Sequence, residues 1–486
     1  MIEIQAKIHD KFSVEFKVGF IARKRLAVSD FVMNTWIFIP NSLDINPMTY
    51  GKTRFYRDIK SNVRLITPVY LLRDLANTDT FPFRELEKSF RTLSSSPTRT
   101  TTGEYESQVK MFASILKSAL RDEYLHIVHN TAQEDRIYLT KEYVANIQGV
   151  VSKFRDLRKI INVSTVPANT LEYFHFGDEF ISNVIEQHVN KLQDFLNSEH
   201  PQEYFVLKKT LQEFLVNELN YKREKNYRTV NTESKTNNRE FIFRAGMLKK
   251  YIESDLYLIA RKKRNTFLLE QILFSFAAGM SMVFATIVSF SFQQKYGNFT
   301  LPVFIALVIS YMLKDRIKEL MRFYFAHKLG SKFFDNKTFI SIKSQQIGWS
   351  KEGFDFITDS KVLREVMELR GRSSLLEAEN RRIDEKIILY RKRVRLNRKQ
   401  IANISTYPIP GIHDIIRFNV SEFIRKMDNP EVPVFGNDEA GNGIRVHGEK
   451  TYYLNFVIQC QYEEQLEYKR YRIMFNRLGI KKIETF

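Results

Sequence analysis

A run of 21 residues without a charged side chain, ILFSFAAGMSMVFATIVSFSF at 272–292, constrains this chain more than any other feature. An α-helix rises about 1.5 Å per residue, so the run would reach about 31 Å, the thickness of a hydrocarbon core. It therefore predicts a membrane-spanning helix. The alternative is a buried helix in a large soluble α-protein, where uncharged runs of this length are rare.

A second apolar run, FTLPVFIALVISYML at 299–313, has only 15 residues before Lys314. Pro302 lies near its start, where a helix tolerates proline, and Lys314 can lengthen a short span by snorkelling. Because only six residues, 293–298, link the two runs, an antiparallel partner is the simplest arrangement. We therefore predict a transmembrane hairpin over 265–313.

The segment YMLKDRIKELMR at 311–322 keeps apolar residues at helical spacing after the second run ends. This spacing predicts a charged helix over 314–330 that continues the second span beyond the membrane.

Basic residues flank the two runs, whereas the link between them contains only Lys295. The positive-inside rule then predicts two spans with both termini in the cytoplasm. These flanking residues are also candidates for contact with anionic lipid headgroups. They are Arg261, Lys262, Lys263, Arg264, Lys314 and Arg316.

Small residues recur every four positions in both runs: Ala277, Ser281, Ala285 and Ser289 in the first, Ala306 and Ser310 in the second. Small side chains let membrane helices approach closely. The pattern predicts packing between the two helices of one chain; a homo-oligomer formed through the same faces is the alternative. Neither run contains an internal acid, histidine or arginine, which argues against a transporter site.

Outside these runs the patterns predict an α+β membrane protein. Period-two alternation on both sides of HDK at 9–11 predicts an N-terminal β-hairpin in a small α+β domain over 1–93, and helical spacing predicts a mainly helical cytoplasmic domain over 94–264. A cytoplasmic α+β domain follows over 331–486. Alternation at 451–462, 466–476 and 480–484 predicts that its small sheet ends in a β-meander.

The formal charge of +19 favours an anionic partner. The densest basic stretch lies at 391–399, in a predicted strand over 386–396. Its candidate contacts with phosphate or lipid headgroups are Arg391, Lys392, Arg393 and Arg395. The alternative is a solvated strand face. No nucleic-acid-binding motif is visible, so nucleic acid as a partner is unsupported.

Signatures of catalysis are missing from the sequence, including GxGxxG, Walker A, HExxH and GxSxG. Glu123, His126 and His129 share a helical face and resemble half of a di-metal site. The stretch HFGDEF at 175–180 offers Asp178 and Glu179 but no second ExxH motif, so we expect no metal and no cofactor. Whether the chain is an enzyme stays open.

Several stretches together resemble a group of uncharacterised bacterial inner-membrane proteins: 46–68, 311–322, 453–459 and 468–484. The resemblance implies an inner-membrane location and no assigned activity. We expect a scaffold or sensor that presents two cytoplasmic domains to unidentified cytoplasmic proteins at the lipid bilayer. The alternatives are an enzyme of unrecognised type in the helical domain, and a binder of anionic lipid or nucleic acid through 391–399.

Overall fold

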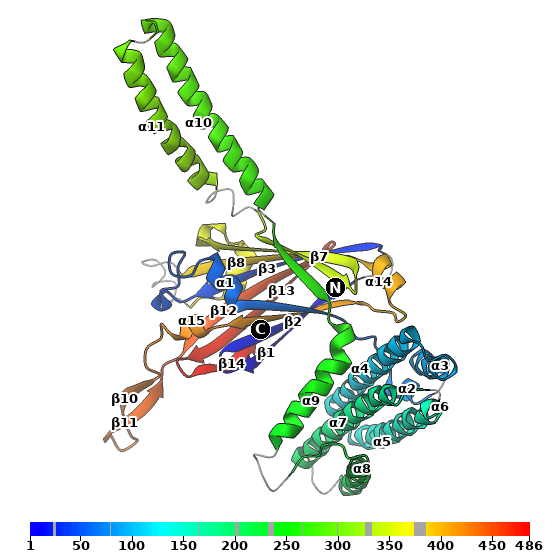
Figure 1. Cartoon of the computed structure of the whole chain (residues 1–486). Coiled ribbons are helices and arrows are strands. Elements are labelled where there is room, and N and C mark those ends of the chain that lie inside the picture. The colour runs from blue at the N-terminus through cyan, green and yellow to red at the C-terminus, as the bar shows by residue number, and fades with distance from the viewer. Residues whose placement is uncertain are drawn as a thin grey trace. The chain divides into compact units, whose positions relative to one another are not determined.

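Strands from both ends of the chain share the same sheets (Figure 1). The computed structural model describes residues 1–22, 26–77, 79–164, 166–199, 204–231, 238–265, 267–298, 300–325, 333–373 and 385–486. The chain divides into two units. We call residues 1–64, 258–406 and 410–486 the sheet unit, and residues 65–257 with 407–409 the helical unit.

The sheet unit contains an eight-stranded sheet and a four-stranded sheet. The larger has the order β14 (Gly479–Thr485), β13 (Gln465–Asn476), β12 (Tyr452–Tyr462), β3 (Val28–Ile39), β8 (Lys386–Asn397), β7 (Gln345–Ile357), β6 (Asn336–Ile342), β5 (Ile259–Arg264). The smaller has the order β1 (Ile2–Asp10), β2 (Ser13–Ile21), β9 (Gly411–Asn419), β4 (Ile59–Leu65).

Aromatic side chains fill the space between these two sheets. The ring centroids of Phe16 on β2 and Phe456 on β12 lie 5.3 Å apart, and those of Phe418 on β9 and Phe456 lie 5.8 Å apart. Alternating apolar residues on each strand thus meet face to face, as in a β-sandwich. The short elements of this unit are η1 (Asn41–Leu43), α1 (Lys52–Asp58), η5 (Asp359–Lys361), α12 (Arg364–Arg370), α14 (Arg398–Ile404), α15 (Ser421–Ile424) and the separate hairpin of β10 (Glu431–Asn437) and β11 (Gly443–Glu449).

The predicted small C-terminal sheet is wrong, although its hairpins form. Strands β1 and β2 pair antiparallel as predicted, and so do β12, β13 and β14. However, β3 lies between β12 and β8, so that Asn34 pairs with both Gln459 and Arg391. Local alternation shows that a strand exists, but it does not reveal a partner more than 350 residues away.

The helical unit packs long amphipathic helices around one apolar core. Phe154 stacks between Phe112 and Phe174, with ring centroids 5.7 and 5.1 Å away. Its elements are α2 (Leu72–Leu75), α3 (Phe81–Ser95), α4 (Arg99–His129), α5 (Gln133–Asp156), α6 (Arg158–Ile161), α7 (Ala168–Glu199), α8 (Phe205–Glu224), α9 (Asn238–Ile252) and η2 (Glu253–Leu256). The predicted helical character up to residue 264 is wrong at its end, because residues 259–264 form β5 of the sheet unit.

Between β5 and β6 the chain forms two packed helices, α10 (Phe267–Tyr296) and α11 (Leu301–Tyr324). We call them the helix pair (Figure 1). Strands β5 and β6 are paired, and at the base of the helix pair the Asn265 amide N donates to the Asp335 carbonyl O at 2.8 Å. The sheet therefore holds the chain segment before α10 and the segment from residue 333 onward side by side at one edge.

The prediction of two transmembrane spans is wrong for the second run. In the part of the chain that the structure describes, one helix is long and apolar enough to cross a membrane, at Glu270–Tyr296. Helix α11 falls short because its apolar run of about 22 Å ends at Lys314 and charged residues follow. The helix does continue through Lys314 as predicted, to Tyr324; positions 326–330 of the predicted charged helix lie outside the described residues.

Candidate functional site

Strand β8 carries the predicted basic residues on two opposite faces. Period-two alternation turns Lys392 toward the four-stranded sheet, together with Tyr390. Arg393 and Arg395 lie on the other face, which we call the outer face of the eight-stranded sheet, and their side chains are 42% and 44% exposed. Lys392, one of the four candidate contacts on this strand, is therefore buried on the face opposite Arg393 and Arg395.

Lys392 belongs to a buried ion cluster inside the sandwich. Its ammonium group pairs with Asp414 and lies 3.1 Å from Glu352 Oε1. Tyr390 donates its hydroxyl to Glu352 Oε1 at 3.0 Å, and Ser61 donates its hydroxyl to Asp414 Oδ1 at 2.6 Å. Each carboxylate thus has a charged partner and a neutral donor, which is what burial of charge requires.

The electrostatics of this cluster fix its charges at neutral pH. Burial alone would raise the pKa of Glu352, but Lys392 and Lys262 outweigh it and hold this pKa at about 2. For Lys392, burial opposes the charge, yet Asp414 and Glu352 raise its pKa above the usual value. Lys262 reaches Glu352 Oε2 at 2.9 Å from β5, so this predicted headgroup contact is also engaged in an ion pair.

The remaining predicted basic residues have different surroundings. Arg395 and Arg393 contact Asp30 at 2.5 and 3.4 Å. Burial of Asp30 favours its neutral form, but hydrogen bonds from the two arginines lower its pKa. Arg391 lies over the Phe334 ring at 5.5 Å. Arg261, Lys263 and Arg264 are exposed on β5, Lys314 lies over the Tyr311 ring at 4.0 Å, and Arg316 is exposed.

The small residues predicted to pack helices divide into two groups. Ala277 and Ser281 on α10 are buried, as are Ala306 and Ser310 on α11. Ser281 donates to the Ala278 carbonyl O at 2.8 Å, which hides its hydroxyl within its own helix. The other two small residues, Ala285 and Ser289, are half-buried. The structure thus brings the buried members together where α10 meets α11.

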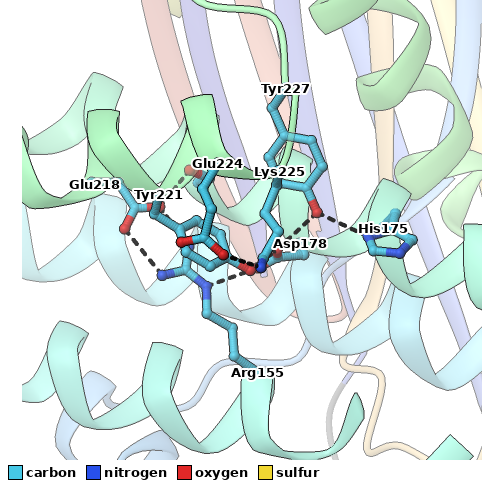
Figure 2. Close-up of polar contacts among 9 residues, drawn as sticks. Arg155, His175, Asp178, Glu218, Tyr221, Glu224, Lys225 and Tyr227 are labelled. Atoms are coloured by element: carbon cyan, nitrogen blue, oxygen red, sulfur yellow. Dashed lines mark hydrogen bonds and ion pairs between the residues drawn. The ribbon is translucent and has the colours of Figure 1, made fainter. Parts of the chain in front are cut away.

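A second buried network joins three helical segments of the helical unit (Figure 2). Arg155 on α5 contacts Asp178 on α7 at 3.0 Å and Glu218 on α8 at 2.6 Å. Tyr221 and Tyr227 donate their hydroxyls to Asp178 at 2.7 and 2.9 Å. One arginine therefore neutralises two carboxylates that are almost wholly buried, and both carboxylates raise the pKa of Arg155 against the effect of burial.

Sequence reasoning found only part of this network. Asp178 was visible beside Glu179, which instead pairs with Arg244 at 2.7 Å. Arg155 and Glu218 were missed, although each is a charge set among the apolar residues of its helix. Such a charge on an apolar face is the available signal, because a buried charge needs a partner on another element.

The histidine motif of α4 meets no second set of ligands in the part of the chain that the structure describes. His126 and His129 are exposed and Glu123 is half-buried. Within the described ranges, no group of three potential metal-ligating side chains forms.

Comparisons with protein-family models, with curated proteins and with solved structures found no match to this chain.

Proposed function

We propose that this protein is a membrane-attached scaffold whose helix pair holds the sheet unit and the helical unit at a lipid surface, in the bacterial inner membrane that the sequence resemblance implies. The observation that carries this proposal is the apolar surface of α10. Only 11% of the residues in the most apolar 18-residue stretch of α10 are buried within the protein. A contiguous apolar surface of this kind is typical of a site that meets lipid or another protein.

Large side chains on α10 point outward along its length. Ile272, Val283 and Ile287 are 66, 52 and 60% exposed, and Phe290 is 65% exposed. Moving one such side chain out of water contributes about 1.5–3 kcal/mol, so several together favour lipid strongly. Because α10 begins three residues after β5 ends, a membrane that binds this helix would also hold the sheet.

The two buried networks support a scaffold rather than a catalyst. In each, the buried carboxylates are paired with a cation from another element, Lys392 in the sheet unit and Arg155 in the helical unit. Pairs of this kind fix how elements pack, because breaking one leaves an uncompensated buried charge.

Membrane fractionation of the full chain tests the proposal. We expect the protein to stay in the membrane pellet after alkaline carbonate extraction. Val283→Lys with Ile287→Lys should release it, since a lysine at the centre of the hydrocarbon core costs about 2.5–3.5 kcal/mol. The control, Phe205→Lys with Val206→Lys, changes two apolar side chains on α8 that are 70 and 71% exposed and should leave the protein in the pellet. A wild-type protein that is extracted by carbonate would overturn the proposal.

A further inference from the structure

The outer face of strands β5 to β8 carries a row of cations. The strand registers pair Lys263 with Lys337, Lys337 with Lys351, and Lys351 with Arg393. Four positive charges therefore stand directly opposite one another on four consecutive strands. Like charges in directly opposed cross-strand positions destabilise a sheet, so the stability of the fold does not explain this row.

A second row, two positions further along the strands, adds aromatic rings to the same face. Here Phe339 pairs with Trp349, and Trp349 pairs with Arg395. The Trp349 ring lies 5.4 Å from the Lys337 ammonium group and 5.1 Å from that of Lys351, and 5.5 Å from the Arg395 guanidinium group. Three cations thus surround one indole, an arrangement suited to an interface between water and lipid.

Counter-charges on this face are few among the described residues. Asp30 pairs with Arg393 and Arg395, while no ion pair within the described ranges involves Lys263, Lys337 or Lys351. Burial lowers the pKa of Lys351, and the neighbouring Lys337 and Arg393 lower it further. The row therefore has an unsatisfied positive potential, which an anionic partner would neutralise.

The chain itself indicates which anionic partner is in reach. Strand β5 ends at Arg264 and α10 begins at Phe267, three residues later. Three extended residues span about 10 Å at most, and Lys263 is one residue further back. A membrane that receives α10 would therefore lie within about one or two Debye lengths of Lys263, the first residue of the row.

We propose that this face, formed by Lys263, Lys337, Lys351, Arg393 and Trp349, binds the headgroups of an anionic membrane. The inference rests on the proposed membrane attachment and adds its lipid chemistry. Lys337, Lys351 and Trp349 were not candidates in the sequence, whereas Lys392 and Lys262, which were, contact Glu352 instead. On the same face of the sheet, α12 packs against Trp36 and Ile387. The row of cations lies on the other half of this face, on the side of β5 and β6.

Vesicle flotation of the full chain separates this inference from the proposed function. Wild-type protein should float with neutral phosphatidylcholine vesicles through α10. A wild-type protein that does not float would contradict the proposed membrane attachment but not the binding of headgroups by the sheet face. The variant with Val283→Lys and Ile287→Lys isolates the sheet face. It should float with vesicles containing phosphatidylglycerol, not with neutral ones, and high salt should release it.

Adding Lys263→Gln, Lys337→Gln and Lys351→Gln to that variant should weaken flotation about a hundredfold, since each lysine near an anionic surface contributes about 1 kcal/mol. The matched control, Lys209→Gln, Lys249→Gln and Lys250→Gln, removes the same charge from exposed positions of the helical unit and should leave flotation unchanged. Thermal unfolding confirms that both variants fold. Equal flotation of the two variants would overturn the inference, as would displacement of the vesicles by a stoichiometric amount of RNA.

Discussion

Lys392 is a cation held inside the sandwich, where its partners decide its role. The side chain is 1% exposed, and Asp414 and Glu352 neutralise it. Replacing Lys392 with an uncharged residue would leave the two carboxylates as uncompensated buried charges, at a cost of about 3–5 kcal/mol. A pair at the surface, such as Arg395 with Asp30, contributes about 0–1 kcal/mol.

The substitution Lys392→Met should therefore lower the free energy of unfolding of the sheet unit by about 3–5 kcal/mol, and Arg395→Met by less than 1 kcal/mol. Tryptophan fluorescence during denaturation measures this, because Trp36 and Trp349 both lie in the sheet unit. Equal losses in the two variants would show that Lys392 is not a structural charge.

Glu352 gives the same cluster a dependence on pH. Its pKa is about 2 in the folded chain, against 4.5 for an unperturbed glutamate. Since the folded value is the lower one, the stabilising contribution is present above pH 4.5 and is lost as pH falls through about 2. Its full size is about 3 kcal/mol. In Glu352→Gln this part of the acid destabilisation should vanish, so the stabilities of variant and wild type should converge between pH 4.5 and 2. Parallel curves would contradict the assignment.

The alternation at 386–396 already placed Lys392 with Tyr390, Val394 and Leu396, away from the three arginines. What the sequence lacks is the identity of the acids, because Glu352 and Asp414 come from strands that only the folded sheets bring to Lys392. Residue patterns therefore predict which face a charge occupies, and long-range strand pairing decides whether that face is buried.

At the scale of elements, the helix pair lies in the chain between two paired strands of the eight-stranded sheet, β5 and β6. The row Lys263, Lys337, Lys351 and Arg393 lies on β5 to β8, and its opposed charges weaken the sheet they belong to. Under the proposed binding of headgroups, the sheet gives up some stability for function, a trade-off that is common in proteins.

Lys337→Thr with Lys351→Thr should therefore stabilise the sheet unit by a few tenths of a kcal/mol up to about 1 kcal/mol, because threonine suits strands and the repulsion disappears. The measurement is the midpoint of thermal unfolding in low salt. The gain should shrink at high salt, where repulsion between exposed charges is screened. A loss of stability in both conditions would show that the two lysines contribute to folding.

Elements whose partners are close in sequence were the ones that could be predicted. The hairpins β1–β2 and β12–β13 and the apolar face of α4 follow from local periodicity. The length of an apolar run also indicated α10, but it overestimated α11, where helix continues while apolar character stops at Lys314. Helix formation and membrane crossing are separate properties, since charged residues permit the first and oppose the second.

At the scale of the whole molecule, the helical unit is an insertion in the sheet unit. The chain leaves the sheet unit after Arg64 and returns at Leu258, where the Leu258 amide N donates to the Val63 carbonyl O at 3.0 Å. Domain boundaries predicted along the chain, at 93 and 264, could not reveal this, because a sequential division assumes that each domain is one continuous segment. Insertion of one domain into another is tolerated where the two chain ends lie together.

Replacing residues 65–257 with a short Gly-Ser linker should consequently leave the sheet unit folded, since the two ends that it joins are already hydrogen-bonded neighbours. Tyr407 loses its hydrogen bond to Gln108, a local effect at the edge of the deletion. We expect the fluorescence transition of Trp36 and Trp349 to keep its cooperativity and the truncated chain to remain in the membrane pellet. A control deletion of 28–39 removes β3 from between β12 and β8 and should abolish the transition. Loss of the transition in both deletions would show that the helical unit is required for the sheets to fold, and that the two units form one cooperative structure.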